Sequence, residues 1–178
     1  RLNLSDRQLR RGIRQGLDAF KRFRQSQADE GRRALEELAP DEKAIVIISR
    51  PYNGFDRRLS LEIPEKLRRL GLKVIPMDYL PIHDGDGNHR DMYWRYGRRI
   101  LQAAHYIRKH PTLFAVYMTS FGCGPDPFIL HFFRKAMAFT SSGGTQNFDV
   151  FLGGDIYLAG DDDGVPYNSS GAVGGQDC

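Results

Sequence analysis

The segment from Phe114 to Met137 constrains the fold of this chain more than any other. It begins with FAVYMTS, which is mostly apolar, β-branched or aromatic and is typical of a strand buried on both faces of a parallel sheet. A Gly-Cys-Gly loop around Cys123 ends the strand, and two prolines then open an amphipathic helix with Asp126 as its expected N-cap. A strand, a tight loop and a helix in this order predict one unit of an α/β fold.

The thiol in this loop is the first candidate for chemistry. We expect Cys123 at the carboxyl edge of the sheet, beside the positive end of a helix dipole, where a thiolate is stabilised. Arg50 is expected at the same edge and would favour the thiolate further. The alternative is a buried cysteine that only fills space under the loop.

Further buried strands and helices flank this unit. The expected strands are Ala44–Ser49, Leu72–Pro76 and Phe148–Leu152, and the expected helices are Leu61–Leu70, capped by Ser60, and Asp91–His110. We expect the inward face of the second helix to run from Tyr93 through Ile100 to Ile107. The alternation predicts a three-layer α/β fold, an open parallel sheet in which the strands at 44–49, 72–76 and 114–120 are adjacent and helices cover both faces.

A long basic helix is expected before the first strand. It begins with a capping box at Ser5 and Gln8 and runs to Leu38, with a break expected near Asp29–Gly31. Its apolar face comprises Leu9, Ile13, Leu17, Phe20, Ala34, Leu35 and Leu38. The remaining surface is rich in arginine and lysine. Because no aromatic side chains are interleaved for stacking, this pattern favours a solvated face or a partner surface over nucleic-acid binding.

The composition limits the class of protein. A chain of 178 residues with 40% hydrophobic and 27% charged residues is typical of one soluble domain with appendages. No apolar run reaches the roughly 20 residues of a membrane span, and no signal peptide opens the chain. Two cysteines make no disulfide framework, so we expect a cytoplasmic protein. A net charge of +4 is too small to predict nucleic-acid binding by itself.

Three segments are expected along the chain. Residues 1–39 form the basic amphipathic helix, residues 40–137 the α/β domain, and residues 138–178 a tail rich in glycine, aspartate and serine. The tail has no sustained periodicity, and we expect poor order from Gly160 onward. Since the sequence starts at Arg1 rather than at a methionine, we expect it to be a piece of a longer protein.

The loops after the three parallel strands are expected to form one site. In an open parallel sheet such loops share an edge, and ligands bind in the crevice there. The polar and reactive residues of these loops are Arg50, Tyr52, Asn53, Asp78, Tyr79 and Cys123. Each also has a purely structural interpretation, for example Asn53 as a turn former and Asp78 as a cap.

Several motifs are absent, and three weaker patterns stay open. The sequence contains no GxxxxGK[ST], GxGxxG, GxSxG or CxxC. Asp84, Asp86 and Asn88 resemble the start of a calcium loop, although Arg95 stands where the closing glutamate belongs. The other two patterns are a zinc site at His83 and His89 and a dyad of Cys123 with His131. One cysteine cannot hold an iron–sulfur cluster alone, so other ligands would have to complete one.

Five blocks of sequence resemble a known family. They are RPYNGFD (Arg50–Asp56), IPEKL (Ile63–Leu67), VIPMDYLP (Val74–Pro81), MYWRYGRRIL (Met92–Leu101) and FGCGPDPFILHFF (Phe121–Phe133). In this order they are similar to an uncharacterised domain of CoA-substrate-specific enzyme activases, which are relatives of the 2-hydroxyacyl-CoA dehydratase and benzoyl-CoA reductase system. The resemblance is dense from about Asp41 to Met137 and looser over the preceding helix.

The resemblance implies an accessory role in low-potential electron transfer. It implies a module of an ATP-dependent activase for 2-hydroxyacyl-CoA dehydratase-type enzymes that is not catalytic alone, because the ATP-hydrolysing modules of such proteins lie elsewhere. It implies Cys123 as a candidate ligand of a 4Fe–4S iron–sulfur cluster. The implied partners are other domains of the parent activase or dehydratase subunits, with acyl-CoA as a further candidate ligand.

Two other functions are kept beside this one. The first is a non-redox interaction module that docks the basic helix and the sheet edge onto a partner. The second is a small thiol enzyme that uses Cys123 as its nucleophile.

Overall fold

The computed structural model describes residues 4–83, 85–86, 89, 91–119, 124–138, 148–152 and 155–159. Residues 138, 148–152 and 155–159 are described by their backbone. The helices are α1 (Asp6–Glu36), α2 (Pro51–Phe55), α3 (Ile63–Arg69), the 3-10 helix η1 (Met77–Tyr79), α4 (Arg95–Arg108) and α5 (Pro125–Ala138). The strands are β1 (Ala44–Ser49), β2 (Lys73–Pro76), β3 (Leu113–Thr119), β4 (Phe148–Leu152) and β5 (Asp155–Ala159).

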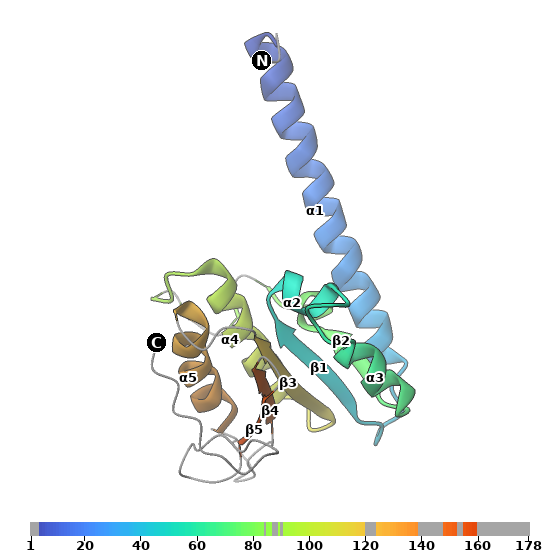
Figure 1. Ribbon diagram of the computed structural model, residues 1–178. Helices are drawn as coiled ribbons and strands as arrows, with labels where there is room; N and C mark the ends of the chain where they lie inside the picture. Colours follow the sequence, from blue (N-terminus) through green and yellow to red (C-terminus); the bar gives the residue numbers. More distant parts are fainter. Residues whose placement is uncertain are drawn as a thin grey trace.

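One sheet with the order β2-β1-β3-β4-β5 organises the chain (Figure 1). Strand β1 is parallel to β2, with Ala44 opposite Lys73, and parallel to β3, with Ala44 opposite Leu113. The predicted set of three adjacent parallel strands is therefore confirmed. Strand β4 pairs parallel with β3 at the predicted position, and β5, which the sequence pattern did not predict, pairs antiparallel with β4. The expectation of poor order from Gly160 onward lies outside the described residues.

Helices cover both faces of the parallel strands, as predicted. Helices α4 and α5 pack on one face, where Ile100, Ile107 and Phe133 join the core made by alternate residues of β1 and β3. Helix α3 packs on the other face, where Ile63 and Leu67 contact Ile47 and its neighbours. The chain thus passes from β1 to β2 along one face and from β2 to β3 along the other. This change of face puts the topological switch point between β1 and β3, where ligands of such sheets commonly bind.

Helix α4 begins four residues later than predicted. Its N-cap is Trp94, and Tyr93, which we expected to face inward, is 89% exposed. The inward positions at Ile100 and Ile107 are confirmed. Gly97 explains the close contact with α5, because a Cβ there would lie only 3.0 Å from the Ile129 side chain.

Helix α3 is also shorter than predicted, and Ser60 does not cap it. Leu61 and Glu62 have φ values of 51° and 55°, in the left-handed region that interrupts a right-handed helix. The helix therefore begins at Ile63. The Ser60 hydroxyl donates a hydrogen bond to the carbonyl of Arg57, 3.4 Å away, instead of accepting one from the helix.

Helix α1 is continuous, so the predicted break near Asp29–Gly31 is wrong. The predicted capping box is confirmed, since Ser5 and Gln8 exchange both hydrogen bonds. Gly31 is needed for packing: a Cβ at this position would lie 1.7 Å from the carbonyl oxygen of Tyr79 in η1. The glycine lets the helix lie directly against η1.

The two ends of α1 have different surroundings. Its last turns pack against the core through Ala34 and Leu35, with Leu38 just beyond the helix. The part from Asp6 to Phe23, called here the projecting segment, extends away from the α/β body (Figure 1). The larger apolar side chains of the projecting segment are between 51% and 57% exposed and are Leu9, Ile13, Leu17, Phe20 and Phe23. In the described part of the chain, no helix is both long and apolar enough to cross a membrane.

Candidate functional site

Two buried carboxylates lie at the carboxyl edge of the parallel strands. Asp78 follows β2 in η1, and Asp126 lies in the first turn of α5, next to the end of β3. They are 5% and 2% exposed, respectively. A buried carboxylate needs charged or hydrogen-bonding partners, and the partners of these two differ.

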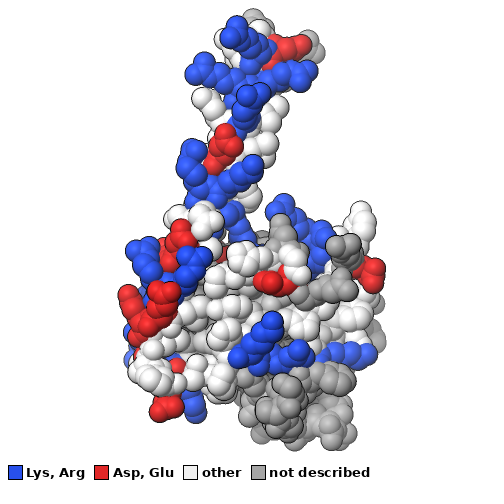
Figure 2. All heavy atoms as spheres, turned by 180° about the vertical axis from the view of Figure 1, so that it is seen from behind, with Lys and Arg blue, Asp and Glu red and all other residues white. Residues whose placement is uncertain are grey.

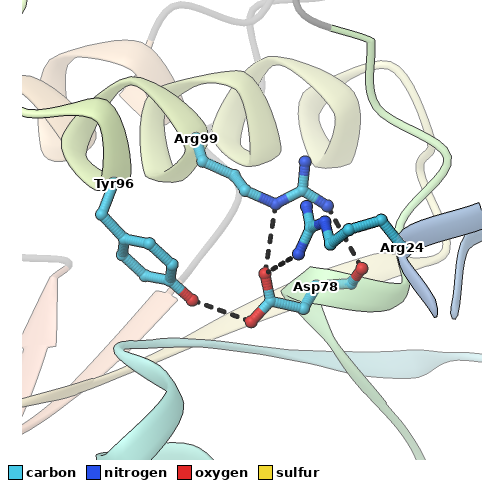
Figure 3. Close-up of polar contacts among 4 residues, drawn as sticks. All are labelled: Arg24, Asp78, Tyr96 and Arg99. Carbon is cyan, nitrogen blue, oxygen red and sulfur yellow. Dashed lines mark hydrogen bonds and ion pairs between the residues drawn. The ribbon is translucent and has the colours of Figure 1, made fainter. Parts of the chain in front are cut away.

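Asp78 is surrounded by more positive charge than it can balance (Figure 3). Its Oδ1 accepts hydrogen bonds from Arg24 Nη1 at 3.0 Å and from Arg99 Nε at 3.2 Å. Its Oδ2 accepts one from the Tyr96 hydroxyl at 2.8 Å, and its backbone carbonyl accepts one from Arg99 Nη2 at 3.1 Å. These four residues, the Asp78 cluster, therefore hold two guanidinium groups and one carboxylate.

The ionisation of the Asp78 cluster follows from burial and from these charges. Burial raises the pKa of Tyr96, and the neighbouring carboxylate of Asp78 raises it further, so the phenol stays protonated and donates to Asp78. Burial lowers the pKa of Arg99, and the nearby charge of Arg24 lowers it further, while Asp78 opposes both effects. Arginine side chains in proteins carry their positive charge at neutral pH. The cluster thus keeps an excess of one positive charge.

Asp126 is balanced by one arginine and one hydroxyl. Arg50 donates to Asp126 Oδ1 from Nε at 2.8 Å, and its Nη2 lies 2.6 Å from the same oxygen. Thr119 Oγ1 donates to Oδ2 at 2.6 Å. Burial alone would lower the pKa of Arg50, but the hydrogen bond and charge of Asp126 raise it overall. This Asp126 cluster joins the ends of β1 and β3 to the start of α5, at the topological switch point. Asp126 thus lies within α5 and pairs with Arg50, rather than preceding the helix as its N-cap.

The residues predicted for one shared site occupy different places. Arg50 pairs with Asp126, while Tyr52 is 42% exposed and Asn53 is buried, both on α2 rather than in the expected turn. Asp78 and Tyr79 lie together at the end of β2 and line a cleft with Pro51 and Phe55. Cys123 lies outside the described residues, so its place at this edge stays a prediction.

A cleft of about 770 Å³ opens beside the Asp78 cluster. One wall is aromatic and comes from α1, α2 and η1; its members are Phe20, Phe23, Phe55 and Tyr79. The other wall is cationic and comes from α4; its members are Arg95, Arg98 and Arg99. The other lining residues are Arg24, Gln27, Pro51, Asp78, Tyr96 and Gln102. The volume is in the range of small-molecule sites, roughly 300–1,000 Å³.

Sequence reasoning missed most of this lining. Asp78 and Tyr79 were expected at a site, whereas the arginines of α4 were expected only as part of the MYWRYGRRIL block. Phe20 and Arg24 were interpreted as parts of a solvated amphipathic helix. The spacing of Arg95, Arg98 and Arg99 at i, i+3 and i+4 was an available signal, because it puts three cations on one helix face.

The metal patterns seen in the sequence do not form a ligand set in the part of the chain described. No group of three histidine, cysteine, aspartate or glutamate side chains converges among the residues searched. His89 stacks on His105 with ring centroids 4.9 Å apart, and Asp86 accepts a hydrogen bond from the backbone N–H of His83 at 2.8 Å. Asp84 and Asn88 of the calcium pattern lie outside the described residues, as do Cys123 and Cys178, the only cysteines.

Comparison with known proteins gives one family. No curated protein and no solved structure matches the chain. A family model described as CoA enzyme activase uncharacterised domain (DUF2229) matches residues 1–80. This range includes α1, β1, α2, α3, β2 and η1. It therefore covers the first two resembling blocks and nearly all of the third. The blocks at 92–101 and 121–133 lie beyond it. The matched residues 1–80 are less than half of the 178 residues of the chain, and this part is similar to the CoA enzyme activase uncharacterised domain.

Proposed function

We propose that this chain is an accessory module of a CoA enzyme activase protein and that it docks onto a partner through the projecting segment of α1. The observation that supports the proposal most directly is the exposure of Leu9, Ile13 and Leu17 on one face of that segment. These three side chains, the docking stripe, continue the apolar face that the same helix buries against the core farther along.

The docking stripe gains free energy when it is covered. Full burial of a leucine or isoleucine side chain contributes about 1.5–3 kcal/mol relative to exposure. A helical segment without tertiary packing is also marginally stable in water, because most helical stability in proteins comes from packing of the apolar face. Both effects favour a bound partner over a bare stripe.

The charge of the projecting segment indicates what kind of partner fits. Residues 4–24 contain seven arginine or lysine residues and two aspartates, a net charge of +5. Figure 2 shows these basic side chains along the length of the helix. A second copy of the same segment would be repelled, whereas an apolar groove bordered by acidic side chains would be attracted. We therefore propose another domain of the activase, or a subunit of the CoA-dependent enzyme that it serves, with such a groove.

A binding experiment with matched variants tests the docking proposal. The chain is titrated into the purified ATP-hydrolysing activase module, and separately into the CoA-dependent enzyme, from the same organism. Ile13→Glu and Leu17→Glu should each weaken binding at least tenfold, because each places a carboxylate in the apolar contact. Gln15→Glu adds the same charge on the opposite face of the helix and should change the affinity less than threefold.

Two outcomes contradict the docking proposal. One is that the unmodified chain binds neither protein, even at concentrations 100-fold above those needed for detection. The other is an equal loss of affinity in Gln15→Glu and Leu17→Glu, which would indicate a purely electrostatic contact. Circular dichroism of each variant shows whether α1 is still helical.

The role in low-potential electron transfer is a further proposal, and the resemblance of the FGCGPD block supports it. Cys123 is the proposed ligand of an iron–sulfur cluster, and Arg50, Tyr52, Asn53 and Asp78 are proposed to lie near the bound cofactor. No thiol and no convergent ligand set is found among the described residues, so the other ligands are proposed to come from a partner or from elsewhere in the chain. When bound, such a cluster supplies one-electron chemistry.

Iron analysis tests the cluster proposal independently of docking. The chain and its Cys123→Ser variant are reconstituted anaerobically with iron and sulfide, both alone and with the partner proteins. The proposal predicts iron and visible absorption in the wild-type complex and a loss of both in the variant. Equal iron content in the two would exclude Cys123 as a ligand.

A further inference from the structure

Several polar side chains that line the cleft beside the Asp78 cluster have no hydrogen-bond or ion-pair partner in the described part of the chain. Gln27 is 7% exposed, lines the cleft, and has a buried side-chain oxygen with no hydrogen-bond partner. A buried amide oxygen that makes no hydrogen bond is unfavourable. A ligand in the cleft that donates to Gln27 would remove this cost.

The cationic wall also has unused binding capacity. No acidic side chain in the described part of the chain lies within ion-pair distance of Arg95 or Arg98. Arg24 and Arg99 share the single carboxylate of Asp78. The lining as a whole contains four arginines and one aspartate, a net charge of +3. Guanidinium groups in this arrangement bind phosphate oxygens through paired hydrogen bonds.

The opposite wall is suited to a flat, apolar group. Phe20, Phe23 and Phe55 are each about half exposed, so their ring surfaces are available. Phe55 and Tyr79 add two neighbouring rings to this wall, with centroids 6.5 Å apart and planes tilted by 43°. Nucleic-acid bases stack favourably on such side chains because every base has a flat π-face.

We propose that the cleft is a binding site for a nucleoside phosphate, with the base against the aromatic wall and the phosphates on Arg95 and Arg98. Asp78 holds Arg24 and Arg99 in place between the walls, and Gln27 accepts a hydrogen bond from the ligand. The same chemistry is present in free ADP or ATP and in the nucleotide half of CoA. The site uses neither the docking stripe nor Cys123; it shares Asp78 with the proposed surroundings of the iron–sulfur cluster, and nucleotide titration tests it separately from docking and from iron binding.

Calorimetric titration of the whole chain tests the site and distinguishes its two sources of ligand. The probes are ADP, ATP, CoA, dephospho-CoA and inorganic pyrophosphate. The proposal predicts binding of at least one of the nucleotides at least tenfold tighter than pyrophosphate. Tighter binding of CoA than of ADP and ATP identifies the CoA nucleotide as the ligand, and the reverse order identifies the free nucleotide.

Variants assign the binding to the cleft. Arg95→Gln with Arg98→Gln should weaken nucleotide binding at least tenfold. The control, Arg68→Gln with Arg69→Gln, removes the same charge from the exposed surface of α3 and should change it less than twofold. Phe55→Leu should weaken nucleotide binding at least threefold and leave pyrophosphate binding unchanged.

Photolabelling gives a readout that does not depend on a variant folding. An 8-azido nucleotide should label peptides containing Phe20, Phe23 or Phe55, and excess nucleotide should prevent the labelling. The proposal is overturned if no nucleotide binds at 1 mM, if the two double variants lose affinity equally, if pyrophosphate binds as tightly as the nucleotides, or if the label is found only outside the cleft.

Discussion

The two buried carboxylates at the edge of the sheet have the same chemical type and similar burial, but their surroundings differ. Asp126 is matched by one arginine and a threonine hydroxyl, so its cluster is neutral. Asp78 is bonded to two arginines and a phenol, so its cluster is positive, and it borders the cleft. A cluster whose charges are balanced joins structural elements. A cluster with an excess of positive charge beside a cleft can also bind an anionic ligand. The comparison teaches that the balance of charge, and not burial, separates the candidate site from the scaffold.

Removal of the balanced carboxylate should have the largest effect on stability. Asp126→Ala leaves Arg50, which is mostly buried, without its partner, and breaking such a pair costs about 3–5 kcal/mol. We expect a loss near the lower value, because part of the Arg50 side chain is in contact with solvent. Urea unfolding measures the change.

An exposed pair provides the control for this variant. Asp29 and Arg32 form an ion pair with both side chains more than 40% exposed, so Asp29→Ala should leave the urea midpoint of unfolding nearly unchanged. If Asp126→Ala costs no more than Asp29→Ala, the Asp126 cluster does not hold the scaffold together.

Gly31→Ala should disturb the Asp78 cluster and leave the Asp126 cluster intact. The added methyl group would overlap the carbonyl of Tyr79, so α1 must shift and carry Arg24 away from Asp78. Overpacking of this kind costs about 1–3 kcal/mol, and urea unfolding with nucleotide titration should show lower stability together with weaker binding.

Gly16→Ala is the matched control: nothing lies within 4 Å of its Cβ position, and alanine should stabilise the exposed helix by about 0.5–1 kcal/mol. Equal effects of the two variants would contradict the role of Gly31.

Asp78→Asn should separate stability from binding. The variant keeps the shape of the side chain but removes the charge that accepts three hydrogen bonds, at a cost of about 1.5 kcal/mol. The charge of the cleft lining rises from +3 to +4, so affinity for a nucleotide should increase about threefold, as expected for one unit charge a few ångströms away in water. Calorimetry checks both quantities, and a loss of affinity would show that the placement of Arg24 and Arg99 by Asp78 outweighs the effect of its charge.

Alkaline pH should lower the stability of the fold through two buried tyrosines, one next to each cluster. Near neutral pH this effect should be too small to measure. Burial raises the pKa of Tyr96 and of Tyr117, and the charges of Asp78 and Asp126 respectively raise them further. Because the folded state keeps protons that the unfolded state releases above a pKa of about 10, the contribution of these two tyrosines to stability should be constant below pH 9 and fall above pH 10.

Phenolate absorption and denaturation at each pH measure this effect. Tyr96→Phe should reduce the fall in stability above pH 10, since one of the two groups then no longer titrates. Ionisation of all eight tyrosines near pH 10 without unfolding would contradict the assigned environments.

The sequence was sufficient for the parallel sheet because a buried strand has a local signature. AIVIIS and FAVYMTS are too apolar for an exposed strand, and the helices between them determine that the strands run parallel. Helix boundaries were less accurate where the backbone adopts unusual angles, as at Leu61 and Glu62, because neither residue type signals a left-handed conformation.

The candidate site was only partly predictable because it depends on how α1 and α4 pack. Asp78 could be placed from its position after a strand. Arg24 could not, since its contact spans 54 residues and requires Gly31 to bring the helix against η1. Arg99 could not be placed either, since its contact with Asp78 spans 21 residues and depends on how α4 packs against η1. Long-range packing therefore decided which of many surface arginines face the cleft.

The close contact at Gly31 also fixes the direction of α1 relative to the rest of the domain, so that the helix acts as a rigid spacer. The helix is anchored at one end, and its projecting segment from Asp6 to Phe23 is about 27 Å long at about 1.5 Å per residue. Whatever binds near Leu9 is thus held a set distance from the cleft, in a direction determined by the anchor. A change of a few degrees at the anchor would move the tip by about 1–2 Å for a rod of this length.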